Sequence, residues 1–189
     1  REDLNLPVGD EQVKAKFGKK ATDIMVELLD ELGVETKEGD VAKIIDQIRD
    51  EFKSKIKELL VLPGVYDLLD ELKGKYKLAI ATSSRHYAVD TILDKFDMEK
   101  YFEAVVTGDD VTHSKPHPEI FLEAAKRLDV KPENCIVVED AVYGIEAAKA
   151  AKMRSLGVTT GACTLEQLKK SGPDLLVTTL EDFDYHILN

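Results

Sequence analysis

The sequence predicts an α/β fold, in which a doubly wound parallel sheet follows a helical region. Two observations carry this prediction. Beyond Pro63 and Gly64, short apolar runs alternate with segments of helical periodicity, which is typical of right-handed crossovers in a parallel sheet covered by helices on both faces. Before these residues, the chain shows helical patterns and no strand pattern. We therefore divide the chain into a helical region, 1–60, and an α/β core, 61–189.

The composition limits the class of protein. With 189 residues, of which 43% are hydrophobic and 33% charged, the chain is long enough for one domain with a real core. A net charge of −11 argues against sequence-independent binding of nucleic acid, which needs a basic surface. No apolar run has membrane-spanning length, no signal-peptide pattern is present, and two cysteines are too few for a disulfide scaffold. We expect a cytoplasmic monomer or dimer without nucleic-acid or membrane partners.

The helical region contains three amphipathic segments. Asp10 caps a first short helix, 11–17, which Gly18 ends. A second helix ends at Gly33, and a third, longer helix spans 41–60. Apolar residues recur at helical spacing in the last two segments: Ile24, Met25, Leu28, Leu29 and Leu32, then Val41, Ile44, Ile45, Ile48, Phe52, Ile56, Leu59 and Leu60. These apolar faces are expected to pack against one another in a small bundle.

The core is expected to alternate strands and helices. Pro118 suits the first turn of one helix, and the small residues that begin at Gly144 suit a helix packed closely on a sheet. The expected strands are 77–81, 104–107, 135–139, 154–158 and 175–177, and the expected helices are 65–73, 86–96, 118–128, 144–152 and 165–170. Because ligands bind beyond the carboxyl ends of the strands in such sheets, that edge is where a site is expected.

Two adjacent carboxylates follow the central apolar run. Ile136, Val137 and Val138 are β-branched and uninterrupted, which predicts a strand buried on both faces. Glu139 and Asp140 then stand at the carboxyl end, where they repel each other unless a cation lies between them. Hard oxygen ligands of this kind suit Mg²⁺. Alternatively, Asp140 is the N-cap of the next helix, and the run by itself does not decide between the two interpretations.

Polar residues also follow two other expected strands. Thr82, Ser83 and Ser84 come directly after one of them, where a hydroxyl and backbone amides can hold a phosphate oxygen; the alternative is that a serine caps the next helix. Lys115 lies in a loop that two prolines stiffen, so that its ammonium can neutralise a phosphoryl group; the alternative is an ordinary surface lysine. Hydroxyl, lysine and carboxylate pair thus occur at successive strand ends.

Together, these residues resemble the haloacid dehalogenase-like superfamily of phosphotransferases, in the branch of β-phosphoglucomutase and phosphoglycolate phosphatase. The resemblance covers 62–177, and the helical segment 1–60 is similar to most of the family's helical cap, which stands on a Rossmann-like core. The matching segments are 78–84 (Leu-Ala-Ile-Ala-Thr-Ser-Ser), 107–110 (Thr-Gly-Asp-Asp), 114–121 (Ser-Lys-Pro-His-Pro-Glu-Ile-Phe) and 136–148, which contains the acidic pair and a trailing glycine.

The resemblance implies roles for the residues at the strand ends. Thr82 would bind the phosphate together with the backbone amide of Ser83, and Lys115 would bridge the phosphate and the nucleophile. Glu139 and Asp140 would hold Mg²⁺. The implied activity is that of a Mg²⁺-dependent phosphatase acting on a small phosphorylated metabolite, a sugar phosphate or phosphoglycolate, through an aspartyl-phosphate. The alternatives are a phosphomutase like β-phosphoglucomutase, and a non-catalytic fragment that binds anions or a partner protein.

The sequence departs from the family at the nucleophile. The family's Asp-x-Asp after an N-terminal strand is absent, and the Asp-x-Asp at 182–184 follows polar residues and is interpreted as a solvated tail. In the family, the absent strand lies between the strands expected at 77–81 and 135–139, so its loss would leave a gap of roughly 10 Å. We expect either that another segment fills the gap or, as we favour, that the protein has roughly 20–30 residues more than this sequence.

Other charged residues near the expected site are weaker candidates. Lys19 and Lys20 lie in a loop of the expected cap and are candidates for contact with an anionic substrate, although a solvated position explains them equally well. Arg85 and His86 follow the expected phosphate loop and are candidates for a second anionic group. His113 and His117 flank Lys115 without a recognisable metal-ligand spacing.

Overall fold

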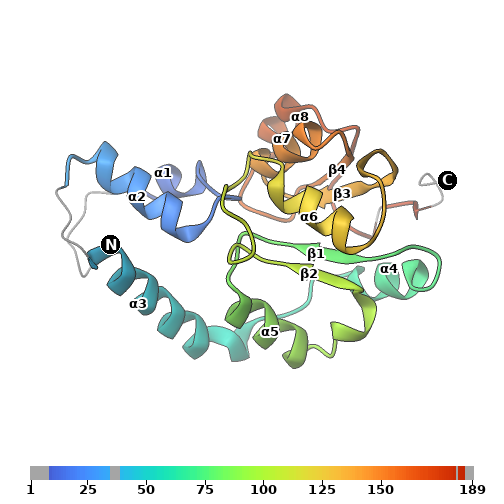
Figure 1. Cartoon of the computed structure of the whole chain (residues 1–189), viewed down its shortest axis with the longest axis horizontal. Helices are drawn as coiled ribbons and strands as arrows, with labels where there is room; N and C mark the ends of the chain where they lie inside the picture. The colour runs from blue at the N-terminus through green and yellow to red at the C-terminus, as the bar shows by residue number, and fades with distance from the viewer. Residues whose placement is uncertain (1–8, 35–38, 182, 186–189) are drawn as a thin grey trace.

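The computed structural model describes residues 9–34, 39–181 and 183–185 (Figure 1). Its helices are α1 (Asp10–Lys14), α2 (Ala21–Glu31), α3 (Asp40–Lys55), α4 (Val65–Leu72), α5 (His86–Lys95), α6 (Glu119–Arg127), α7 (Val142–Ala150) and α8 (Leu165–Ser171). Short 3₁₀ turns occupy Ile56–Glu58, Glu99–Tyr101 and Pro132–Asn134. The strands are β1 (Ala79–Ala81), β2 (Ala104–Val106), β3 (Ile136–Glu139), β4 (Arg154–Val158) and β5 (Leu175–Val177).

The order and type of the elements agree with the sequence prediction. The boundaries of β4 and β5 match it residue for residue, and most other boundaries differ by one or two positions. Two helices end earlier than predicted. The third ends at Lys55 rather than at Leu60, with a 3₁₀ turn following it, and the first ends at Lys14 rather than at Phe17. No residue of α1 is buried, so little packing supports a further turn of this short helix.

The strands form two separate parallel sheets rather than one. β1 pairs with β2, and β4 lies between β3 and β5. Among the described residues, no strand lies between β1 and β3, and we call this interruption the sheet break. It occurs between the same two strands where the family resemblance implies a further strand. That a strand belongs there remains a prediction.

The two sheets nevertheless share one layer of core. Alternate residues of a strand point to opposite faces, so Ala79 and Ala81 of β1 face one way and Ile80 the other. Ala79 and Ala81 pack with Val106 of β2, Val137 of β3 and the inner sides of α6 and α7. Figure 1 shows α6 beside both sheets, with α5 on the opposite side of β1 and β2. The packing of α6 therefore holds β1 and β3 near each other across the sheet break.

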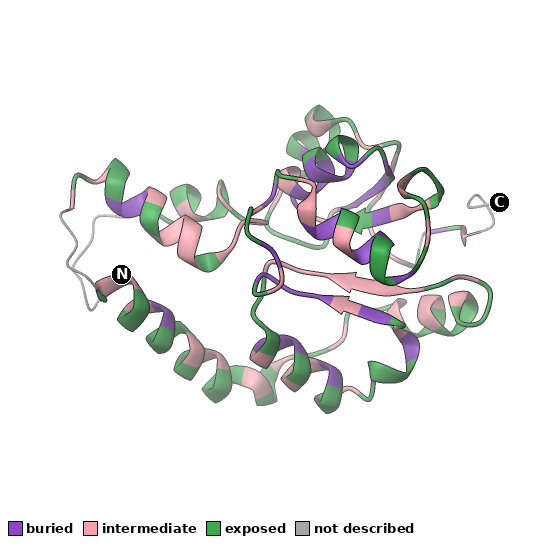
Figure 2. Ribbon diagram, viewed as in Figure 1, coloured by how far each residue is buried: buried purple, intermediate pink, exposed green. Residues whose placement is uncertain are grey.

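Val138 does not fit the prediction of a strand buried on both faces. Its side chain is 48% exposed, whereas its neighbour Val137 is buried in the shared core. Val138 lies on the same face of β3 as Ile136, which packs against Leu156 and Phe183. Val138 lines an open pocket at the carboxyl end of β3, which explains why an apolar residue of this strand is half-exposed. Figure 2 shows buried residues along β2 and on parts of α6 and α7.

The helices before residue 60 contribute a smaller core of their own. Leu28 and Leu29 of α2 and Ile45 of α3 are buried where these two helices pack together, as predicted from their apolar stripes. Figure 1 shows these helices to one side of the sheets. That residues 1–60 form a distinct cap domain remains a prediction. No helix in the described part of the chain is both long and apolar enough to span a membrane.

The C-terminal Asp-x-Asp segment differs from the prediction of a solvated tail. Phe183 is only 7% exposed and packs against Leu156 and Val158 of β4. The prediction failed because it was based on the acidic residues around Phe183 and gave no weight to this single apolar side chain, which packs into the core. Asp182 lies outside the described residues.

Candidate active site

A cavity of about 270 Å³ opens at the carboxyl ends of β1 and β3, beside the sheet break. It is lined by Ala81, Thr82, Lys115, Val138, Glu139, Asp140, Val158, Thr160 and Leu180. The structure thus places the predicted hydroxyl, lysine and carboxylate pair around one cavity. Thr160 and Leu180 were not predicted, because neither belongs to a motif and only the fold brings them to this edge.

Lys115 is buried and paired with Glu139. Its Nζ lies 2.6 Å from Oε2 of Glu139, and the two side chains are only 5% and 10% exposed. The alternative of an ordinary surface lysine is therefore wrong. The ammonium also lies 4.8 Å from the centre of the Phe121 ring, within the range of a cation–π contact. With its ammonium fixed at the cavity wall, Lys115 presents a positive charge without needing to order a flexible side chain.

The backbone holds the Glu139 carboxylate from the other side. Its Oε1 accepts the N–H groups of Asp140 and Ala141, each at 3.2 Å. Helix α7 begins at Val142 with Ala141 as its N-cap residue. The alternative of Asp140 as the N-cap of this helix is therefore wrong, and the Asp140 carboxylate does not cap the helix.

Asp140 is the member of the acidic pair whose charged form is disfavoured. Burial and the neighbouring charge of Glu139 both raise the pKa of Asp140 above its usual range. Among the described residues, the Asp140 carboxylate forms no ion pair. Gly161 and Gly144 approach the two carboxylates so closely that a Cβ on Gly161 would overlap Asp140, and one on Gly144 would overlap Glu139. These glycines make room for the pair.

The acidic pair fits a hard divalent cation. Two carboxylates share a confined position, one of them disfavoured in its charged form, and Lys115 neutralises only Glu139 directly. An added cation would relieve the remaining charge, and oxygen donors of this type suit Mg²⁺. The donor set on the cavity wall is therefore compatible with the predicted metal site.

The loop after β1 has its hydroxyls arranged in different ways. Thr82 lines the cavity, and its Oγ1 accepts the backbone N–H of Ser84 at 3.2 Å, which leaves its O–H free to donate. No hydrogen bond in the described part of the chain uses the backbone N–H of Ser83. The Ser83 hydroxyl, in contrast, donates to the carbonyl of Gly18 at 2.6 Å. That Thr82 and the Ser83 amide bind a phosphate remains a prediction, whereas the Ser83 side chain joins two parts of the fold.

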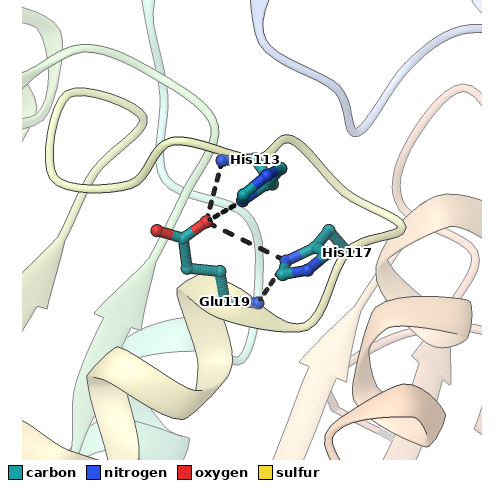
Figure 3. Close-up of side chains that lie close together, drawn as sticks. All are labelled: His113, His117 and Glu119. Atoms are coloured by element: carbon teal, nitrogen blue, oxygen red, sulfur yellow. Dashed lines mark hydrogen bonds and ion pairs between the residues drawn. The ribbon is translucent and has the colours of Figure 1, made fainter.

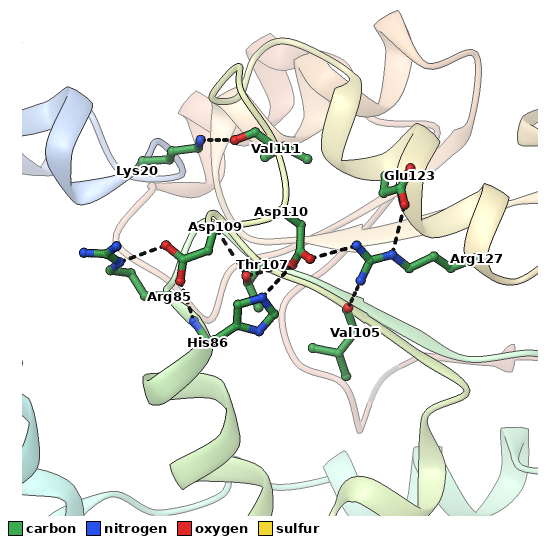
Figure 4. Close-up of polar contacts among 10 residues, drawn as sticks. All are labelled: Lys20, Arg85, His86, Val105, Thr107, Asp109, Asp110, Val111, Glu123 and Arg127. Atoms are coloured by element: carbon green, nitrogen blue, oxygen red, sulfur yellow. Dashed lines mark hydrogen bonds and ion pairs between the residues drawn. The ribbon is translucent and has the colours of Figure 1, made fainter.

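The expected cap loop is attached to the core. Lys20 donates its backbone N–H to Oγ of Ser114 at 2.9 Å, and its ammonium donates to the carbonyl of Val111 (Figure 4). The Lys19 ammonium pairs with Glu27 at 2.6 Å and lies 4.7 Å from the centre of the Tyr143 ring. Both lysines, predicted as candidates for substrate contact, have partners within the protein, and neither lines the cavity.

Residues 1–158 match the family model of haloacid dehalogenase-like hydrolases. The chain belongs to the haloacid dehalogenase-like hydrolase family. This family agrees with the resemblance in the sequence motifs and with the cavity at the carboxyl ends of the parallel strands.

The family includes curated relatives with named substrates. A phosphorylated carbohydrates phosphatase of Thermotoga maritima is 40% identical over 134 residues, which cover 69% of this chain and 62% of the relative. A phosphoglycolate phosphatase of Escherichia coli K12 is 33% identical over 143 residues, which cover 74% of this chain and 57% of the relative. The chain thus spans between 54% and 62% of the length of the first relatives that it matches.

Solved structures of the family share the fold. A β-phosphoglucomutase from Clostridium difficile superposes with a TM-score of 0.87 at 26% identity, covering 99% of this chain and 83% of that one. A hydrolase from Pseudomonas syringae superposes with a TM-score of 0.90 at 24% identity, and the match covers 98% of this chain and 85% of that one. The fold of the chain is therefore that of the haloacid dehalogenase-like hydrolases, with parallel strands and a helical N-terminal segment.

A network of charges supports the loops beside the cavity (Figure 4). Arg85 pairs with Asp109 at 2.9 Å, and His86 contacts Asp110 at 3.2 Å, so both predicted anion contacts already have acidic partners. Burial acts to raise the pKa of Asp110, but hydrogen bonds from Arg127 and Thr107 outweigh it and hold this pKa well below its usual range. The contacts of Asp110 with Thr107 and Arg127 were not predicted, because the motif that contains Asp110 does not show which side chains it meets in the fold.

His113 and His117 show no metal-ligand spacing in the sequence, but the fold brings them together with a carboxylate. Together with Glu119, they offer ligand atoms that all lie within 4.8 Å of one another (Figure 3). The sequence spacing gave no sign of this because the three residues lie in a loop and the first turn of α6, where helical spacing rules do not apply.

Proposed function

We propose that this chain forms most of a Mg²⁺-dependent phosphatase that acts on a small phosphorylated metabolite of the sugar phosphate or phosphoglycolate type. The observation that carries the proposal is a buried lysine paired with one member of a carboxylate pair, with a free hydroxyl donor on the same cavity. The names of the relatives from T. maritima and E. coli support the substrate class.

Each residue has a distinct task in this proposal. Thr82 donates its hydroxyl to a phosphoryl oxygen, and the N–H of Ser83 donates to a second oxygen. Lys115, fixed by Glu139, stabilises the negative charge that develops on the phosphoryl group during transfer. Glu139 and Asp140 would hold the metal. When bound, Mg²⁺ would add positive charge beside the phosphoryl group and stabilise the charge that develops there.

The nucleophile is proposed to come from a strand that fills the sheet break. The carboxylates that line the cavity are Glu139 and Asp140, and both are assigned to the metal. A strand between β1 and β3 would pair with both free edges and end beside Lys115 and Thr82. By its resemblance to the family, this strand would end in Asp-x-Asp. The first carboxylate would form the aspartyl-phosphate, and the second would act as general acid and base.

Phosphate release from a panel of sugar phosphates and phosphoglycolate tests the activity. We expect release in Mg²⁺ that EDTA abolishes, and losses of at least about 100-fold in Lys115→Ala and Asp140→Asn. Lys126→Ala, which removes a surface lysine that is 79% exposed, is the matched control and should be unaffected. Undiminished turnover in either site variant would contradict the proposal, and isomerised sugar phosphate without free phosphate would identify a phosphomutase instead.

The intact mass of the protein purified from its source tests the origin of the nucleophile. The sequence alone accounts for 21.1 kDa, and we expect a mass larger by roughly 2–3 kDa, as a strand, a loop and a helix would require. A mass of 21.1 kDa with tight phosphate binding but no turnover would favour the non-catalytic alternative.

A further inference from the structure

His113, His117 and Glu119 form a cluster on the loop that carries Lys115 (Figure 3). The side chains of His113 and His117 are 61% and 49% exposed, whereas Lys115 is buried. None of the three has a task in the proposed phosphatase reaction, and none lines the cavity. The cluster therefore needs an explanation of its own.

The distances within the cluster suit a small metal ion. Zinc binds imidazole nitrogen and carboxylate oxygen at about 2.0–2.2 Å, so two ligand atoms of a tetrahedral site lie about 3.4 Å apart. Oε2 of Glu119 lies 2.8 Å from Nδ1 of His113 and 3.9 Å from Nδ1 of His117. One of these separations is shorter and the other longer than the separation of about 3.4 Å expected for a tetrahedral site. Small side-chain rotations that move the ligand atoms by a fraction of an ångström would make them equal. All three ligand atoms lie within 4.8 Å of one another.

The carboxylate of the cluster is already held in place and charged. The backbone N–H groups of Thr112 and His113 donate to the Glu119 carboxylate at 3.0 and 2.8 Å. These amides, followed by the His113 side chain, lower the pKa of Glu119 to about 2. The two imidazole rings lie with their centres 4.4 Å apart and their planes 31° from parallel. A metal would therefore meet a fixed anion and two neighbouring rings. Nδ1 of His117 accepts the backbone N–H of Glu119 at 3.3 Å, so this ring must give up that hydrogen bond or turn to offer Nε2.

We propose that His113, His117 and Glu119 bind a divalent transition metal of the zinc class, with water completing the coordination. Imidazole ligands favour Zn²⁺, Ni²⁺ and Cu²⁺, whereas Mg²⁺ prefers sites made of oxygen alone. The ligand chemistry thus separates this site from the one that Glu139 and Asp140 would provide. His113 Nδ1 and Glu119 share a hydrogen bond. On binding, the metal takes the place of the proton on Nδ1, and the neutral imidazole carries that proton on Nε2 instead.

The position of the site bears on the phosphatase loop. His113 and His117 lie two residues before and two residues after Lys115. A metal bound by both would clamp the backbone on either side of that lysine from the solvent-facing side of the loop. The inference itself does not depend on the proposed function, since it concerns metal binding by the loop whether or not the protein is a phosphatase.

Calorimetric titration with ZnCl₂ tests the site directly. Excess Mg²⁺ should be present throughout, so that the oxygen-only site is occupied. We expect one Zn²⁺ per chain. The variants His113→Asn and His117→Asn should each bind at least about tenfold more weakly, since loss of even an outer-shell partner costs roughly 10–100-fold.

A matched control separates the cluster from other histidines and from thiols. His86→Asn removes a half-exposed histidine that contacts Asp110 outside the cluster, and it should bind Zn²⁺ like the unchanged protein. Far-UV circular dichroism without metal should be the same for all variants, because each substituted histidine has an exposed side chain. If the double variant His113→Asn, His117→Asn keeps the original affinity, another group such as Cys163 binds the metal and the proposal is overturned. An equal loss in His86→Asn would overturn it as well.

Discussion

Lys115 shows how much one side chain depends on its partner. Its ammonium and the Glu139 carboxylate lie 2.6 Å apart with little solvent access. The desolvation of two such charges is offset only while they face each other. The pair therefore contributes less to stability than its short distance suggests, but the loss of one partner leaves a buried, uncompensated charge.

Replacement of Lys115 by Met is expected to destabilise the metal-free protein by about 3–5 kcal/mol, because Glu139 would keep its charge without a partner. Urea denaturation in EDTA measures this free energy of unfolding. Lys126→Met removes a lysine of an exposed pair with Glu123 and should change the free energy by no more than about 0.5 kcal/mol. Equal losses in the two variants would show that the Lys115 pair is not buried in solution.

Asp110 is expected to link stability to pH. Its folded-state pKa is lowered, whereas its unfolded value is about 3.9. The stability that it contributes is therefore present above about pH 4 and is lost as pH falls towards the lower folded-state pKa. Asp110→Asn should cost about 2 kcal/mol at pH 7, the value typical of hydrogen bonds to a charged group.

Urea denaturation between pH 3 and pH 7 checks this expectation. The difference between the unchanged protein and Asp110→Asn should shrink as pH falls below about 4. The control Asp46→Asn, at a carboxylate that is 60% exposed, should show only a small difference at every pH. A difference for Asp110→Asn that stays constant with pH would contradict the assigned role of its charge.

Helix α7 illustrates how an element serves the site through its packing. Its third residue, Gly144, lies so near the Glu139 carboxylate that an added methyl group would displace it. An alanine is otherwise favoured over glycine in a helix by about 1 kcal/mol. The glycine therefore reflects the needs of the acidic pair rather than those of the helix.

Gly144→Ala is expected to weaken Mg²⁺ binding by at least about tenfold, because Glu139 must leave its position between Lys115 and the backbone amides. The melting temperature should fall as well, because Lys115 loses its buried partner when Glu139 is displaced. Calorimetry and thermal denaturation measure the two effects. Gly9→Ala, whose methyl group would meet only Gln12 at 3.6 Å, is the control. Unchanged Mg²⁺ affinity in Gly144→Ala would separate Glu139 from the metal.

At the scale of elements, local sequence patterns were sufficient for most of the core. The bounds of β4 and β5, for example, were predicted to the residue. The exposure of Val138 and the burial of Phe183 were not predictable in this way. Both depend on which segment lies opposite in the folded chain, and the sequence pattern carries no such information.

In the site, too, local motifs predicted some residues, whereas others depend on tertiary contacts. Thr82, Lys115, Glu139 and Asp140 follow from motifs at strand ends, since the carboxyl ends of parallel strands meet at one edge. The attachment of Lys20 to Val111 and Ser114, and the cluster around Glu119, arise from loops that fold back on themselves. Loop conformation depends on tertiary contacts, so these arrangements became visible only in the structure.

At the scale of the whole molecule, the sheet break is the dominant feature. Two parallel sheets share the core layer under α6, yet β1 and β3 each have an edge that pairs with no strand among the described residues. Unpaired edges and a half-exposed Val138 are costly in the middle of a fold, and a strand inserted there would satisfy both. The proposed nucleophile strand would pair with both edges and would also supply a nucleophile that the described residues around the cavity do not offer.

The most direct test of this central claim is to locate the phosphorylated residue. Protein purified from its source would be incubated with substrate and Mg²⁺, and the aspartyl-phosphate reduced with borodeuteride and mapped by mass spectrometry of its peptides. We expect the label on the first aspartate of an Asp-x-Asp in a peptide outside the 189 residues. A label on an aspartate within this sequence, or turnover without any label, would contradict the claim that a strand in the sheet break carries the nucleophile.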